Sequence, residues 1–266
     1  KYSSRYRKKG HMDDKWRLLY SFERLIRETL PDIVSMENVP NLIHENIFLD
    51  FVKTLKELKY SIEYKIVNCP DYGVPQHRRR LVLLASRFGK IDLIPPLYDE
   101  EHYITVRDAI GHLQPIEAGE ICINDSLHRS SALSEINMER IRQSVPGGTW
   151  RDWDENLKLR CHRKASGATF PSVYGRMEWD RPSPTMTTQF YGYGNGRFGH
   201  PEQDRAISLR EGAILQSFPE DYIFADEQHP VKKRELGTHI GNAVPVELGR
   251  AIGISIQEHL KKMEVN

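Results

Sequence analysis

A glutamate and two arginines are the side chains in this sequence best placed to do chemistry. Glu37 follows the apolar run 33–34, at the point where a buried strand should end. Apolar neighbours desolvate a carboxyl group and raise its pKa, which favours the protonated form and suits a general acid. Gln76, Arg78 and Arg80 alternate in a segment that leads into a second apolar run. In an extended chain these side chains share one face, where two guanidinium groups can hold a carbonyl oxygen, the carboxylate or a phosphate.

Each motif, taken alone, also fits a purely structural explanation. Glu37 fits a surface glutamate after a strand, and the segment 76–80 fits a solvated basic turn between strands. A third motif, Gly-Asn-Ala-Val-Pro at 241–245, fits a turn that caps a following helix. Its small residues would also let a cofactor approach the backbone.

Together and in this order, the three motifs resemble the DNA (cytosine-5) methyltransferases, and the resemblance covers nearly the whole chain. It implies transfer of a methyl group from S-adenosylmethionine to carbon 5 of a cytosine flipped out of double-stranded DNA. Carbon 5 is a poor nucleophile, so the family attacks C6 with a thiolate. An acid at N3 and donors at O2 then accept the electron density of the ring.

The resemblance also implies roles for individual residues. The glutamate of the Glu-Asn-Val motif hydrogen-bonds the flipped cytosine, and the last arginine of Gln-x-Arg-x-Arg reaches O2. The expected catalytic residues are Glu37, Asn38, Arg78 and Arg80; the expected cofactor-binding residues are Leu18, Asn242, Ala243 and Val244; the expected DNA-binding residues are Gln76, Thr185, Arg210 and, in a mobile active-site loop at 1–14, Ser3, Ser4 and Arg5. The motif Arg-Glu…Gln-Gly-Phe-Pro is matched at 210–219, with Ser217 in place of the usual glycine.

Three features of the family's first half do not occur in these residues: the glycine-rich S-adenosylmethionine loop, the acidic ribose contact and the Pro-Cys nucleophile. Cys69 lies in Asn-Cys-Pro after the wrong strand, which favours a structural role. We therefore expect the second half of a sequence-specific methyltransferase, which needs a complementary N-terminal segment or subunit. The alternative is a non-catalytic DNA-binding or regulatory subunit of methyltransferase fold, although keeping Glu37, Arg78 and Arg80 favours the enzyme.

Hydrophobic periodicity predicts the elements that position these residues. We expect helices over roughly 15–30, 45–59, 134–144, 208–218 and 245–262, and strands over 32–39, 61–67 and 80–85. Ser208 and Glu211 have the spacing of a capping box. The expected fold class is α/β: part of a Rossmann-like methyltransferase sheet with helices on both faces, plus a smaller irregular target-recognition domain.

The composition changes near residue 88, where Pro, Gly, His and Arg become frequent. We therefore assign 1–87 to the second half of the catalytic domain and 88–208 to the target-recognition domain. Residues 209–266 return to the catalytic domain with a C-terminal, cofactor-side helix.

The composition of the 266 residues is that of an ordinary globular protein, with 39% hydrophobic and 28% charged residues and a net charge of +1. The sequence contains no apolar stretch long enough to span a membrane. Its three cysteines lack CxxC spacing, so we expect neither a disulfide framework nor a metal site. We expect an intracellular protein, cytoplasmic or nucleoid-associated if bacterial, and a restriction–modification setting.

Overall fold

A computed structural model of the chain describes residues 17–164, 169–226 and 228–264, which fall into two compact units. Unit 1 contains the described residues of 1–68, 79–96 and 249–266, and unit 2 contains those of 69–78 and 97–248. These boundaries differ from the composition-based ranges 1–87, 88–208 and 209–266, whose functional assignments remain predictions.

Unit 1 is built on a three-stranded sheet with the order β1-β3-β2. The strands are β1 (Ile33–Asn38), β2 (Ser61–Asn68) and β3 (Arg79–Ser86), and β3 is antiparallel to both neighbours. The outer strands β1 and β2 are therefore parallel to each other. They are connected through α2 (Asn46–Glu57), as in a crossover unit of an α/β fold.

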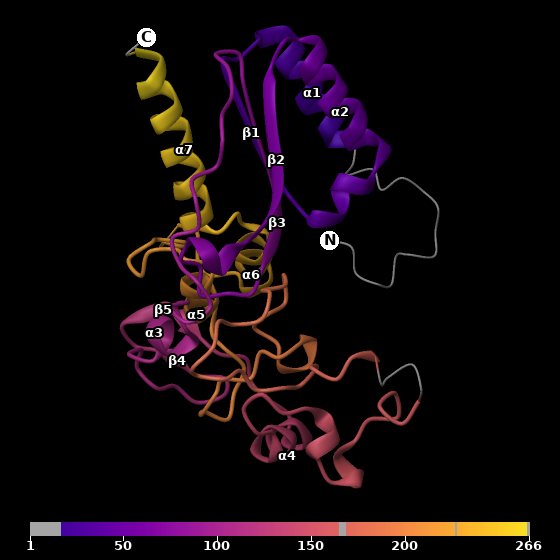
Figure 1. The fold of residues 1–266 in the computed structure, drawn as a ribbon. Helices are drawn as coiled ribbons and strands as arrows, with labels where there is room; N and C mark the ends of the chain where they lie inside the picture. The colour runs from indigo at the N-terminus through magenta and orange to yellow at the C-terminus, as the bar shows by residue number, and fades with distance from the viewer. Residues whose placement is uncertain (1–16, 165–168, 227, 265–266) are drawn as a thin grey trace. The chain divides into compact units, whose positions relative to one another are not determined.

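Helices cover both faces of this sheet (Figure 1). On one face, α1 (Arg17–Thr29) and α2 enclose an apolar core in which Phe48 and Phe51 of α2 are fully buried with Leu83 of β3. On the other face lies the C-terminal part of α7 (Val246–Glu264), where His259 Nε2 is 2.7 Å from Ser86 Oγ. The expectation of helices on both faces is confirmed.

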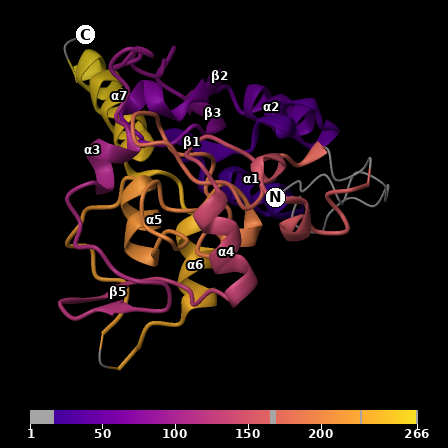
Figure 2. The ribbon, with the colours of Figure 1, turned by 90° about the horizontal axis from the view of Figure 1, so that it is seen from below.

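Unit 2 has little regular structure, as the composition predicted. Its helices and strands among the described residues are α3 (Val106–Ile110), β4 (Ile121–Cys122), β5 (Asp125–Arg129), α4 (Glu135–Gln143), α5 (Leu209–Leu215) and α6 (Lys233–Asn242), with short 3-10 helices between them. Helix α5 packs against both β5 and α6 (Figures 1 and 2). The larger apolar cluster of unit 2 includes Phe190 and Leu209, and another gathers around Trp150, Trp153 and Tyr193.

Most predicted elements are found within a few residues of their expected ends. The capping box at α5 is also confirmed, because Ser208 Oγ accepts the N–H of Glu211 while the Glu211 carboxylate accepts the N–H of Ser208. Helix α6 is a correction. The turn predicted over 241–245 begins later than expected, because Gly241 and Asn242 form the last residues of α6.

None of the helices that the structure describes is both long and apolar enough to cross a membrane.

Candidate active site and cofactor-side turn

Sheet register brings Glu37 and Arg80 together in unit 1. Glu37 lies opposite Val82 in the β1–β3 pair, so Arg80, two residues before Val82, is its diagonal neighbour on the same face. Glu37 Oε1 is 2.6 Å from Arg80 Nε, and both side chains are largely buried, with exposed fractions of 15% and 12%. Arg80 Nη1 also donates to the carbonyl of Arg79 at 2.7 Å.

This ion pair changes the electrostatics expected for Glu37. Burial alone favours a protonated carboxyl group, but a guanidinium in contact with it favours the ionised form. The sequence left open whether Arg78 or Arg80 would contact the Glu37 carboxylate. In the structure the contact is made by Arg80. The neighbouring Asn38 has a local role, since its Oδ1 accepts the N–H of Val39 at 2.8 Å.

Gln76 and Arg78 belong to unit 2, and both are buried there. The amide of Gln76 is bonded at both ends, to the N–H of Met186 and to acceptors at 215–216. Arg78 donates through longer contacts of 3.3–3.4 Å to the carbonyls of Met186, Gly241 and Ala243.

The expectation that Gln76, Arg78 and Arg80 form one projecting row is therefore corrected. Strand β3 begins only at Arg79, and Gln76 instead forms a parallel bridge with Ser183. The hydrogen bonds of Gln76 and Arg78 lie within unit 2, whereas the ion pair of Arg80 lies within unit 1.

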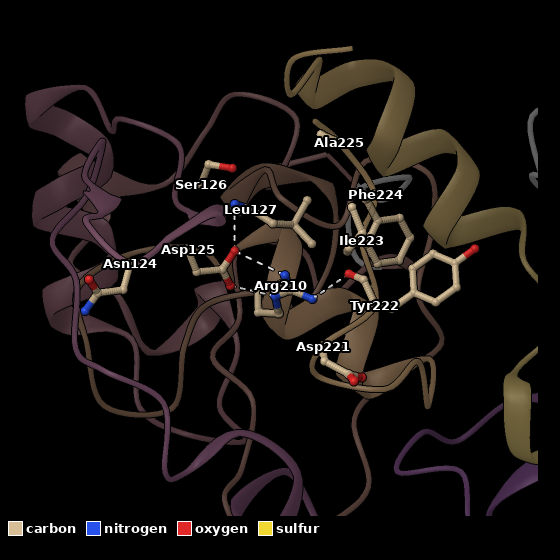
Figure 3. A pocket seen from close by; sticks show the side chains of 10 residues that line it. All are labelled: Asn124, Asp125, Ser126, Leu127, Arg210, Asp221, Tyr222, Ile223, Phe224 and Ala225. Atoms are coloured by element: carbon tan, nitrogen blue, oxygen red, sulfur yellow. Dashed lines mark hydrogen bonds and ion pairs between the residues drawn. The ribbon is translucent and has the colours of Figure 1, made fainter. Parts of the chain in front are cut away.

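Arg210 lines a hollow of about 190 Å³ in unit 2 (Figure 3). Its guanidinium forks onto the Asp125 carboxylate, with N–O distances of 2.6 and 3.1 Å, and its Nη1 donates to the carbonyl of Tyr222. Burial raises the pKa of Asp125, but the hydrogen bond and charge of Arg210 and the backbone N–H groups of Leu127 and His128 together outweigh it, so the pKa lies below its usual value. These contacts anchor the β4–β5 hairpin to α5, whereas the predicted DNA contact of Arg210 is untested.

The remaining candidates are mostly exposed. Asn242, Val244 and Leu18 present their side chains to solvent, while Ala243 is half-buried at the end of α6. Thr185 is exposed and donates to the carbonyl of His77 at 2.6 Å. Ser3, Ser4, Arg5 and the rest of the expected loop at 1–14 lie outside the described residues.

The glycine at 241 has a packing reason. A Cβ placed there would lie 2.4 Å from the carbonyl oxygen of Thr187, so the backbone of α6 approaches the 187–188 backbone directly. A glycine is therefore required at 241 by a backbone contact within unit 2, whereas the sequence suggested that small residues there let a cofactor approach.

Comparison with known proteins assigns the family. The profile of the C-5 cytosine-specific DNA methylases matches residues 1–258. A type II methylase from Herpetosiphon aurantiacus, M.HgiDII, is 54% identical over 97% of this chain and 73% of its own length. A type II methyltransferase from Haemophilus parahaemolyticus, M1.HphI, is 33% identical over 96% of the chain and 63% of its own length.

The chain belongs to the C-5 cytosine-specific DNA methylase family.

Solved structures support the methyltransferase fold. A structure described as an Escherichia coli prophage DNA modification methyltransferase superimposes with a TM-score of 0.68 at 21% identity, over 94% of this chain and 75% of that one. The Dnmt2 methyltransferase of S. pombe gives a TM-score of 0.50 at 17% identity, over 94% and 72%. The expected α/β methyltransferase fold is thus confirmed.

Methylases of this family depend on S-adenosylmethionine, and the exposed residues at the end of α6 fit part of it. An exposed amide such as that of Asn242 can donate to a carboxylate and accept from an ammonium group, as the zwitterionic methionine end requires. Val244 adds an exposed apolar side chain beside it.

Two side chains acquire importance only in the structure. Asp125 holds the guanidinium of Arg210, and no motif in the sequence marked it. Gln216 was noticed only as part of a longer motif, yet it is fully buried and hydrogen-bonded to Gln76 and to the carbonyl of Ile240.

Proposed function

We propose that this chain forms the cytosine-binding and target-recognition part of a DNA (cytosine-5) methyltransferase of the type II restriction–modification class. The observation that carries the proposal is the Glu37–Arg80 ion pair on one face of the β1–β3 pair, between residues that resemble the family's Glu-Asn-Val and Gln-x-Arg-x-Arg motifs. The high identity to the type II methylase M.HgiDII supports the class, and an intracellular location beside the DNA follows from it.

In this proposal the cytosine is flipped out of the duplex, because its C5=C6 bond is unreachable within the base stack. Glu37, whose ionised form is favoured by the contact with Arg80, takes up a proton from solvent as the base enters and donates it to N3, while Arg80 holds O2. Because Arg80 already contacts the Glu37 carboxylate, both side chains are oriented before the base binds.

Asn242, Ala243 and Val244 would hold the methionine end of S-adenosylmethionine, which supplies the methyl group. Thr185 would contact DNA near the extruded base, and Leu18 would lie beside the cofactor. Each of these three roles rests on the family resemblance together with the exposed position of the side chain or turn.

We further propose that catalysis requires a complementary N-terminal segment or subunit that carries the Pro-Cys nucleophile and the glycine-rich loop. The support is that neither motif occurs within the 266 residues. The second candidate, a non-catalytic DNA-binding subunit of the same fold, is disfavoured by the Glu37–Arg80 pair, which binding alone does not need.

One experiment tests both parts of the proposal. The chain is assayed for methyl transfer to DNA alone and with a polypeptide that supplies Pro-Cys and the glycine-rich loop. We expect activity only in the mixture, and in that mixture Glu37→Gln should slow single-turnover transfer by about 10²–10⁴-fold with a smaller change in DNA affinity. Glu63→Gln is the matched control, because Glu63 is a half-buried carboxylate on β2 of the same sheet.

Robust methylation by the chain alone would refute the need for a partner. A loss below tenfold for Glu37→Gln would reduce Glu37 to a structural residue. DNA binding without methyl transfer in the mixture would favour the non-catalytic alternative.

A further inference from the structure

Two buried glutamines connect residues 185–186, proposed to lie near DNA, to the C-terminal end of α6, proposed to lie near the cofactor; all of them belong to unit 2. The N–H of Met186 donates to Gln76 Oε1 at 2.8 Å, and Gln76 Nε2 donates to Gln216 Oε1 at 3.0 Å. Gln216 Nε2 in turn donates to the carbonyl of Ile240 at 2.7 Å. The hydrogen bonds thus run in one direction from residue 186, next to Thr185, to α6 two residues before Asn242.

The orientation of each amide depends on the other. The N–H of Met186 can only donate and the carbonyl of Ile240 can only accept, so the two ends fix both side-chain amides. Turning either amide around would place donor against donor or acceptor against acceptor. Both side chains are fully buried, where water cannot replace a lost partner, so such a mismatch is costly.

Further contacts tie the same two segments together. Gln76 Nε2 also donates to the carbonyl of Leu215 at the end of α5. Arg78 reaches the carbonyl of Met186 at one end and those of Gly241 and Ala243 at the other. Both ends of the glutamine pair are therefore held by more than one bond.

We infer that Gln76 and Gln216 are positioning residues that couple DNA binding to cofactor binding. A displacement of the 185–186 backbone by DNA would shift the Gln76 amide, and through Gln216 the end of α6 that carries Asn242. In this assignment Gln76 acts on DNA through the backbone of Met186, because its own buried amide is occupied within the protein. The assignment of DNA to one end and S-adenosylmethionine to the other rests on the function proposed above.

The test uses Gln76→Met and Gln216→Met, which keep an unbranched side chain of similar size but remove the amide. S-adenosylmethionine affinity is measured by calorimetry on the complemented enzyme, with and without DNA, together with the melting temperature. We expect the DNA-dependent change in cofactor affinity to shrink by about threefold or more in either variant. Because both residues act in one chain of bonds, the double variant should lose little more coupling than each single variant.

The control is Gln143→Met, which removes another hydrogen-bonded amide of unit 2. Gln143 Nε2 donates to Asp154 Oδ2 at 2.6 Å and takes no part in the hydrogen bonds from Met186 to Ile240. Gln216→Glu gives a rescue arm, since its carboxyl group can donate to the Ile240 carbonyl only when protonated. Coupling in that variant should recover as the pH is lowered. A lower melting temperature with unchanged coupling would overturn the inference and leave the two glutamines a purely structural role.

A second readout does not depend on either ligand. Hydrogen exchange of the Met186 amide should accelerate in Gln216→Met, because Gln216 holds the amide of Gln76, whose Oε1 accepts the N–H of Met186. If the exchange rate at Met186 rises no more than the rates at other buried amides of unit 2, the inference that Gln216 acts on Met186 through Gln76 is overturned. This outcome does not depend on what the enzyme methylates. Loss of methylation activity in the unsubstituted mixture, with the exchange effect present, would count against the proposed function alone.

Discussion

The contact between Arg80 and Glu37 leads to a prediction about the guanidinium group. Arg80 engages the carboxylate through Nε and a backbone carbonyl through Nη1, and the proposal adds the O2 of cytosine. A lysine ammonium is a point charge that cannot reproduce this planar arrangement. We therefore predict that Arg80→Lys loses roughly 10²-fold or more in single-turnover rate, nearly as much as Arg80→Ala. Arg79→Lys, at the exposed neighbouring arginine, is the control, and full activity of Arg80→Lys would contradict the role.

Ser217, where the family has glycine, has a backbone conformation that favours glycine. Its φ is +60°, in the left-handed region that costs a residue with a Cβ roughly 1–2 kcal/mol. Its hydroxyl compensates, because Ser217 Oγ accepts the N–H of Glu247 at 3.1 Å in the first turn of α7. The serine therefore combines backbone strain with a helix cap, and its substitution separates the two effects.

We predict that Ser217→Ala, which keeps the strain and loses the cap, lowers the free energy of unfolding by about 1 kcal/mol. Ser217→Gly loses the same cap but relieves the strain, so it should be close to the unsubstituted protein. Urea unfolding of the three proteins gives the comparison. Equal stability of the alanine and glycine variants would show that the positive φ carries no cost here.

At the scale of the element, the start of α5 is held by more than its capping box. The Glu211 carboxylate is fully buried and accepts from Nη1 and Nη2 of Arg205, at 2.7 and 2.8 Å. Burial raises the pKa of Glu211, but the charge and hydrogen bonds of Arg205, the charge of His200 and the N–H of Ser208 together outweigh it, so the pKa is lowered to about 2. Beside it, burial lowers the pKa of His200 to about 4, partly opposed by the charge of Glu211.

This cluster predicts the pH dependence of stability. His200 is protonated near pH 6.5 in the unfolded state but only near pH 4 in the folded state. The contribution of neutral His200 to the free energy of unfolding is therefore fully present above pH 6.5 and is lost as the pH falls to about 4. The shift corresponds to roughly 3 kcal/mol. Stabilisation by ionised Glu211 is present above its unfolded pKa of about 4.5 and is lost as the pH falls towards 2.

Denaturant unfolding between pH 7 and pH 4 checks this prediction. His200→Asn should flatten the dependence, because its amide oxygen can still accept the N–H groups of Glu202 and Gln203 without titrating. His44→Asn, at an exposed histidine, is the control and should retain the original slope. An unchanged slope in His200→Asn would assign the acid sensitivity to other groups.

At the scale of the whole molecule, we predict that exchanging residues 88–208 for those of a relative changes the DNA target without abolishing methyl transfer. The structure adds a condition to this experiment. The exchanged segment contains Arg205 and Ser208, which bond to Glu211 outside it. A chimera that keeps these two residues should fold and methylate a new site, whereas one that replaces both should unfold at a lower temperature. Methylation of the original site by the folded chimera would contradict the assignment of specificity to 88–208.

Features that depend on neighbouring residues can be predicted from the amino-acid sequence alone. The apolar spacing of Phe48 and Phe51 predicts α2, and the spacing of Ser208 and Glu211 predicts the cap of α5, because both interactions span only a turn of helix. The order of three short motifs identified the family. These signals are local in the chain, so a single sequence suffices to detect them.

Contacts between residues far apart in the chain became visible in the folded structure. Insertion of β3 between β1 and β2 pairs Arg80 with Glu37, and packing at 215–216 buries Gln76. Helix α6 was missed for the same reason. Its Gly237 and Gly241 weaken the helical pattern, yet a Cβ at Gly237 would lie 2.3 Å from the ring of Tyr191 and one at Gly241 would meet Thr187. Close approach to a distant segment fixes these residue types, and no local pattern in the sequence records that approach.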